Sequence, residues 1–330
     1  MRLIATYTPE IPLWPQLPQN PKEGMIRQFL CGFPGLVEDG NRYWIDTEQS
    51  GFATEMTYFY EDFLQAETSR LLPRNSRFSL NRETAQGFYT LEEALKTSEL
   101  QPFMVKGQIT GPVTTGIGVK DQSGASIFYD NDLGDILIKL LSLKARWQVE
   151  QLQQYGNRAA PIIFIDEPGM VSFASTAFAG VSREMVSASV AEVIAGIRQA
   201  GGLAGIHICA NGDWGPALLS DADIISFDAY SYFDNFILYQ EQLSYFLARG
   251  GVLAWGIIPT GDPGAVAGES VETLYEKWLK QREKISSLGF SPIQLMQQTL
   301  IAPSCGTGSL SLQLAEKVLL MTSLLSRKIR

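Results

Sequence analysis

The chain has very little histidine and cysteine. Among its 330 residues there is one histidine, His207, and there are three cysteines, at positions 31, 209 and 305. Three widely spaced cysteines do not make a disulfide framework, so we expect a reducing compartment, the cytoplasm. Against this scarcity, the stretch "IHICANGD" (206–213) stands out, because it places His207 two residues before Cys209.

The chain also lacks basic clusters and long apolar runs. Its formal net charge is −9 and it has no run of Lys or Arg, which argues against nucleic acid and anionic membrane surfaces as partners. No stretch approaches the ~18 uninterrupted apolar residues of a membrane span. The N-terminal stretch "MRLIATYTPEIPLWPQLPQNP" is interrupted by an acidic residue and several prolines, so we expect no secretory signal peptide.

From about residue 103 onward, apolar runs alternate with amphipathic segments. The segments 131–156 and 182–201 have apolar residues at helical spacing. The expected strands are "FMVKGQI" (103–109), "PIIFIDEP" (161–168), "LAGIHIC" (203–209), "ADIISFDA" (222–229), "GVLAWGI" (251–257) and "QTLIAPS" (298–304). Apolar strands that alternate with helices predict an α/β fold with a parallel sheet buried on both faces.

Such a sheet can be an open doubly wound sheet or a closed (β/α)8 TIM barrel. Polar residues follow the expected strand ends at Asp166, His207, Asp228 and Cys305. A barrel brings all its strand ends to one mouth, whereas an open sheet spreads them along an edge. We therefore predict a (β/α)8 barrel, with residues 1–330 as a single domain and residues 1–100 as an N-terminal extension with early barrel elements. The glycine-rich "GGLAG" (201–205) precedes a strand, so it is not a dinucleotide-binding fingerprint.

The spacing of His207 and Cys209 is compatible with a metal site. On a strand, residues at i and i+2 point to the same face, and imidazole and thiolate are the ligands that zinc prefers. In a barrel, Cys305 and Asp228 end other strands at the same mouth. The alternative is a packed histidine beside an inert thiol, and spacing alone leaves both interpretations open.

At these residues the chain resembles a known family. The HxC pair, "DADIISFDA" and the late "PSCG" are similar to the C-terminal catalytic domain of cobalamin-independent methionine synthase, a zinc-binding (β/α)8 barrel shared in outline with uroporphyrinogen decarboxylase-like corrinoid methyltransferases. "KGQITGPVTTG" (106–116) resembles the family's KG-x-x-TGPVT motif, and "FIDEPG" (164–169) resembles its IDEP motif. The resemblance covers residues 100 to 315. It implies that His207, Cys209 and Cys305 ligate zinc, and that a substrate thiol such as homocysteine is methylated.

The chain departs from the family in three ways. Asp228 stands where the family's fourth ligand is glutamate, so it is a less certain zinc ligand. The family's large N-terminal half has no counterpart here. The family's Asp and His that deliver a proton to the folate leaving group are also missing, since the corresponding "AWGIIPTGDP" has no histidine. Because a methyl group on corrinoid cobalt leaves without protonation, we expect methylcobalamin or a corrinoid protein as the methyl donor.

The acidic pair of "FIDEPG" has two interpretations. Asp166 and Glu167 could form loop or cap hydrogen bonds at the strand end, or bind the ammonium of an amino-acid thiol. In the family the Asp of this motif binds that ammonium, which makes Asp166 our substrate-binding candidate, with Glu167 less certain. Lys106 and "TGPVT" are expected to pack at the barrel mouth, and Cys31 is expected to be a packing residue.

Three alternative functions remain open at this point. The first is methyl transfer to another thiol such as coenzyme M. The second is a metal-free, uroporphyrinogen decarboxylase-like enzyme, which would need several arginines to bind carboxylates; "MIRQF" and "SRLLPRNSRF" provide a few, without a motif. The third is a non-catalytic barrel that binds a corrinoid partner. Stoichiometric zinc distinguishes the thiol-activating enzymes from the other two.

Overall fold

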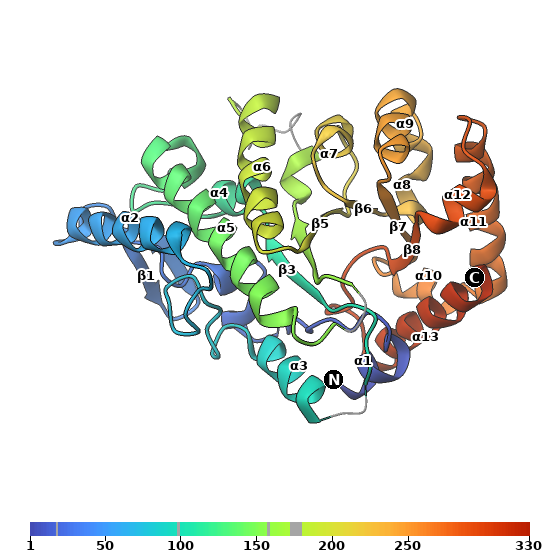
Figure 1. Ribbon diagram of the computed structural model, residues 1–330, viewed down its shortest axis with the longest axis horizontal. Coiled ribbons are helices and arrows are strands. Elements are labelled where there is room, and N and C mark those ends of the chain that lie inside the picture. Colours follow the sequence, from blue (N-terminus) through green and yellow to red (C-terminus); the bar gives the residue numbers. More distant parts are fainter. Residues whose placement is uncertain (18, 98–99, 157–158, 172–179) are drawn as a thin grey trace.

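Six parallel strands form the central sheet (Figure 1). The computed structural model describes residues 1–17, 19–97, 100–156, 159–171 and 180–330. The strands lie side by side in chain order, whereas a doubly wound sheet reverses its order at a switch point. They are β3 (Lys106–Thr110), β4 (Ile162–Asp166), β5 (Leu203–Ile208), β6 (Ile224–Phe227), β7 (Val252–Ile258) and β8 (Thr299–Pro303).

Helices separate these strands along the chain, as the alternating pattern predicts. Buried apolar positions recur at helical spacing in the longer helices, and Asp130, Ser182 and Ser270 cap the N-termini of α5, α6 and α11. The helices after β3 are α4 (Pro112–Gly118), α5 (Asn131–Leu152), α6 (Arg183–Gln199), α7 (Gly215–Leu219), α8 (Ala229–Phe236), α9 (Gln240–Ala248), α10 (Pro263–Gly268), α11 (Val271–Ser286), α12 (Pro292–Gln297) and α13 (Leu312–Ile329).

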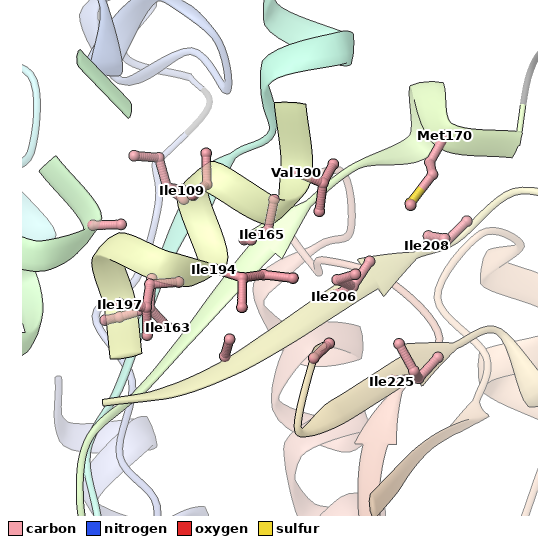
Figure 2. Close-up of a cluster of buried hydrophobic side chains, with 14 of the residues drawn as sticks. Ile109, Ile163, Ile165, Met170, Val190, Ile194, Ile197, Ile206, Ile208 and Ile225 are labelled. Atoms are coloured by element: carbon pink, nitrogen blue, oxygen red, sulfur yellow. The ribbon is translucent and has the colours of Figure 1, made fainter. Parts of the chain in front are cut away.

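One face of the sheet packs against the helices. Ile163, Ile165 and Ile206 alternate with residues of the other face and contact Val190 and Ile194 of α6, all of them buried (Figure 2). Branched side chains suit this position, because the pleated surface of a sheet accommodates them well. Burial of this face stabilises the sheet–helix packing by roughly 1.5–3 kcal/mol per large side chain.

The opposite face of the sheet has an apolar cluster of its own. It is separate from the sheet–helix core and consists of Met104, Ile162, Phe164, Ile224 and Ala254. Ile162 and Phe164 belong to the same strand as Ile163 and Ile165, so the period of two assigns the two sets to opposite faces. A buried cluster on each face is the predicted burial of a parallel sheet, in a barrel wall or an open doubly wound sheet alike.

One short N-terminal segment contacts β3 at one edge of the sheet and, at the other edge, the helix that packs on β8. The Tyr7 hydroxyl in α1 (Arg2–Tyr7) donates to Glu316 Oε1 of α13 at 2.9 Å, and α13 packs on β8. A few residues later, Leu13 forms a parallel bridge with Lys106 of β3. The sheet is therefore curved so that β3 and β8 approach the same segment. The predicted α/β fold, a parallel sheet with alternating helices in a barrel-like arrangement, is confirmed.

The N-terminal hundred residues add an antiparallel hairpin and helices next to α5. These elements are β1 (Leu36–Asp39), β2 (Arg42–Ile45), α2 (Phe52–Thr68) and α3 (Gln86–Thr97). Charged residues of α5 hold the loop after α2: Lys144 Nζ donates to the Ser79 carbonyl at 2.8 Å and Arg146 to the Ser69 carbonyl at 2.6 Å.

Whether the whole chain is a single domain stays a prediction. In the described part of the chain, no helix has the length and apolar character to cross a membrane.

Candidate metal centre

The residues of the predicted zinc site lie together. His207 is in β5, Cys209 follows that strand directly, and Cys305 lies two residues after β8. One ligand atom from each of the three residues lies within 4.8 Å of the other two. Residues almost a hundred positions apart in the chain thus meet at one end of the sheet, as the barrel prediction requires.

Local structure fixes both sides of this cluster. His207 pairs in register with Asp166 of β4 on one side and with Ser226 of β6 on the other. The loop that carries Cys305 is fixed by Ser304, whose amide donates to the Ile258 carbonyl at 2.8 Å and whose hydroxyl accepts from the Thr260 amide at 3.1 Å. Strand pairing and loop hydrogen bonds therefore fix the backbone on both sides of the cluster.

The imidazole of His207 is held by a neighbouring strand. Its Nδ1 lies 2.9 Å from the Ser226 hydroxyl oxygen. A hydrogen bond at Nδ1 leaves Nε2 as the nitrogen available to a metal, and such outer partners orient the imidazole ligand. Ser226 was not singled out from the sequence, although it is the one polar residue in "IISF" and lies on the face of Asp228 by the period of two.

The thiols of Cys209 and Cys305 shift each other's pKa in opposite directions. Hydrogen bonds from Cys209 and His207 lower the pKa of Cys305, and the Gly306 amide acts in the same direction. The hydrogen bond to Cys305 raises the pKa of Cys209, and burial adds to that rise. This amide belongs to the loop before α13, which begins only at Leu312.

The donor set fits zinc. A tetrahedral zinc ion with bonds of about 2.0–2.3 Å to nitrogen and sulfur holds its ligand atoms roughly 3.5–3.8 Å apart, and the observed spread needs only small side-chain adjustments to reach this. Soft sulfur ligands beside imidazole favour zinc over magnesium or calcium. Three protein ligands are also the number in catalytic zinc sites, which keep one position for substrate or water.

Comparisons with known proteins leave the chain without a family assignment. No protein-family model matches it, and no curated protein is significantly similar to it in sequence. Among solved structures, one similar chain is a Listeria monocytogenes protein provisionally described as a vitamin-B12 independent methionine synthase; the match has a TM-score of 0.48 and 16% identity, and covers 73% of this chain and 69% of that chain. An overall similarity at this level does not identify an activity.

Asp228 lies beside the cluster but outside the set of three. Its carboxylate caps α8 by accepting a hydrogen bond from the Ser231 amide at 2.8 Å. Burial raises its pKa, and the charge of Cys305 acts in the same direction. The Ser231 hydroxyl and the Tyr230 amide also act on this carboxylate, which makes helix capping its observed role. Its role as a ligand stays a prediction.

Asp166 lies on the same face as His207. It ends β4, pairs in register with His207, and is partly exposed. Burial raises the pKa of Asp166, while the nearby charges of His207 and Lys106 oppose that rise. A carboxylate in this position is one strand away from the ligand cluster, which suits a group that binds the charged end of a small thiol.

Glu167 has a different environment from Asp166. It is fully buried, and its two carboxylate oxygens accept hydrogen bonds from the Val113 amide at 2.9 Å and the Thr114 amide at 2.7 Å, the first turn of α4. Burial raises its pKa to about 7 in spite of these donors. This is the capping arrangement that the sequence left open for the acidic pair. A substrate contact by Glu167 stays a prediction.

Proposed function

We propose that the protein is a zinc-dependent methyltransferase that activates a thiol, with homocysteine as the acceptor and methionine as the product. The observation that carries this proposal is the convergence of His207, Cys209 and Cys305 within 4.8 Å. The methionine synthase-like motifs at the same strand ends support it. A metal-free decarboxylase or a non-catalytic barrel would have no use for this donor set.

The residues have distinct roles in this proposal. His207, Cys209 and Cys305 hold the zinc, and Ser226 orients the imidazole. Zinc bound there would supply the Lewis acidity that favours the thiolate form of the acceptor at neutral pH. Asp166 binds the acceptor's ammonium and so directs its sulfur toward the cluster. The sulfur forms a bond to the methyl carbon, while the bond from that carbon to the donor breaks and its electron pair stays with the donor.

The methyl donor in this proposal is methylcobalamin or a corrinoid protein. A folate amine leaves well only when protonated, and the sole histidine of the chain is engaged by Ser226 and by the ligand cluster. When a cobalt-bound methyl group is transferred, the corrinoid leaves as Co(I) and needs no proton. An assay with zinc-loaded protein and homocysteine should give turnover with methylcobalamin and none with free methyltetrahydrofolate. Turnover with the folate alone contradicts the donor assignment.

Asp166→Asn tests the acceptor. We expect the KM for homocysteine to rise about tenfold or more, because a buried charge-assisted hydrogen bond to the ammonium is lost. The KM for coenzyme M, which has no ammonium, should change little. Steady-state kinetics with both thiols makes the measurement. Equal effects on the two thiols would favour an acceptor other than an amino acid.

A further inference from the structure

Lys106 is a partly exposed cation on the inner face of the sheet that the proposed chemistry does not yet use. It begins β3 and lies on the inner face with Gln108, Phe164 and Asp166, as the register of β3 and β4 requires. Its side chain extends along the barrel interior, since Nζ donates to Gln108 Oε1 at 3.1 Å and lies 5.1 Å from the centre of the Phe164 ring. The ammonium therefore lies level with Gln108 and Phe164, which precede Asp166 by two positions in the register of β3 and β4.

A buried polar network fixes this ammonium in place. Gln108 Nε2 donates to the Trp14 carbonyl at 3.0 Å, which leaves its Oε1 to accept from Lys106. Gln148 in turn accepts from the Trp14 indole at 3.1 Å and donates to the Gln108 carbonyl at 2.9 Å. The amide of Gln108 has no freedom to rotate, so the position of Lys106 is determined by the fold.

The ammonium of Lys106 has hydrogen-bonding capacity left over. Gln108 accepts one of its three N–H groups, and the other two have no hydrogen-bond partner among the residues that the structure describes. Lys106 and Asp166 attract each other, yet in the described chain they form no ion pair within 4.0 Å. Both side chains are partly exposed, as are His207 and Cys209. A desolvated cation with free donors near a carboxylate is an arrangement that a ligand of opposite charges completes.

We propose that Lys106 and Asp166 together bind a zwitterionic thiol, with the ligand's carboxylate on Lys106 and its ammonium on Asp166. The inference rests on the proposed function for the thiol and adds Lys106 as the residue that binds the acceptor's carboxylate. The ammonium and carboxylate of an amino acid sit on one carbon, and Lys106 and Asp166 offer the two opposite charges on one face of the sheet, near enough to act on each other. A thiol with only an anionic group would leave Asp166 facing a like charge.

Binding of thiol-free probes tests this assignment without methyl transfer. L-2-aminobutyrate is homocysteine without sulfur, propylamine also lacks the carboxylate, and butyrate lacks the ammonium. Calorimetry or NMR titration of the full-length protein should show that 2-aminobutyrate binds at least about tenfold tighter than either fragment. Lys106→Met should remove that advantage over propylamine, whereas Lys106→Arg, which keeps the charge, should retain most of it.

Controls separate recognition from folding. Lys284→Met removes a surface ammonium that pairs with Asp234 at 2.7 Å and should leave all three affinities unchanged. Lys106→Gln provides a second neutral side chain in case Lys106→Met does not fold, and thermal unfolding checks both. The proposal is overturned if 2-aminobutyrate does not bind wild type above the fragments, or if the neutral variants bind it as wild type does.

Kinetics distinguish this inference from the proposed function. With zinc and methyl donor, Lys106→Met should raise the KM for homocysteine about tenfold and leave that for 3-aminopropane-1-thiol within twofold. Zinc content should not change. Equal losses with both thiols would mean that Lys106 only supports the structure. The protein could bind no zinc and transfer no methyl group, and still bind 2-aminobutyrate more tightly than the fragments in a way that depends on Lys106. This result would support the present inference and refute the proposed function.

Discussion

At the scale of single residues, neighbouring acids in one motif have different tasks. Asp166 lies on the inner face beside His207, while the next residue, Glu167, is directed to the amides of α4. The sequence predicted that this pair ends a strand, because charge and proline follow an apolar run. Only the family resemblance favoured Asp166 over Glu167; the residue pattern alone could not distinguish them, since that depends on where the "TGPVT" turn of another strand lies.

Glu167 predicts a pH dependence of stability. Its pKa is about 7 in the folded protein against an ordinary value of 4.5, so the folded state keeps this proton to higher pH. The contribution of the group is then full below about pH 4.5 and is lost as the pH rises through 7, by an amount on the order of 3 kcal/mol. Glu167→Gln removes this titration. Denaturant unfolding of both proteins from pH 4.5 to 8 should show wild type losing stability relative to the variant; parallel curves contradict it.

At the scale of elements, the turn from β3 into α4 depends on the absence of a side chain at Gly111. A Cβ there would lie 2.1 Å from Glu167 Oε2, and the Gly111 amide donates to the Asp166 carbonyl at 2.9 Å. The sequence predicted only that "TGPVT" packs at the barrel mouth. The reason for glycine lies in a partner more than fifty residues away, which no local pattern reveals.

Gly111→Ala should therefore destabilise the protein by about 1–3 kcal/mol, because the added methyl displaces the Glu167 carboxylate from α4. Gly268→Ala is the matched control: it ends α10, and an added Cβ would meet nothing within 4 Å. Its effect should stay within about 0.5 kcal/mol. Chemical unfolding of the two variants makes the comparison. Equal stabilities would contradict the close contact.

At the scale of the whole molecule, the alternation of strands and helices was predictable because each apolar run of "PIIFIDEP" or "LAGIHIC" type has its own local signal. The curvature of the sheet was inferred only indirectly, from the polar residues at strand ends. The N-terminal segment contacts α13 through Tyr7 and β3 through Leu13. Its sequence has no pattern from which these contacts could be predicted. The pairing of His207 with Ser226 likewise needed the register of β5 and β6.

Zinc should stabilise the whole fold, since its ligands join the ends of β5 and β8, three strands apart in the sheet. An ion that binds only the folded state raises its stability by mass action. Removal of zinc with a chelator should lower the Tm by on the order of 5 °C for a chain of this size. Cys31→Ser should respond like wild type, and Cys209→Ser should not respond. A chelator effect of the same size in Cys209→Ser would place the metal elsewhere.

The central claim is that His207, Cys209 and Cys305 form a zinc site, and the most direct test is the zinc content of purified protein by elemental analysis. Wild type and Cys31→Ser are predicted to hold about one zinc ion per chain. Cys209→Ser and Cys305→Ser, with folding checked by circular dichroism, are predicted to hold almost none. Wild type without zinc after expression in zinc-supplemented medium, or folded Cys209→Ser and Cys305→Ser with undiminished zinc, would contradict the account.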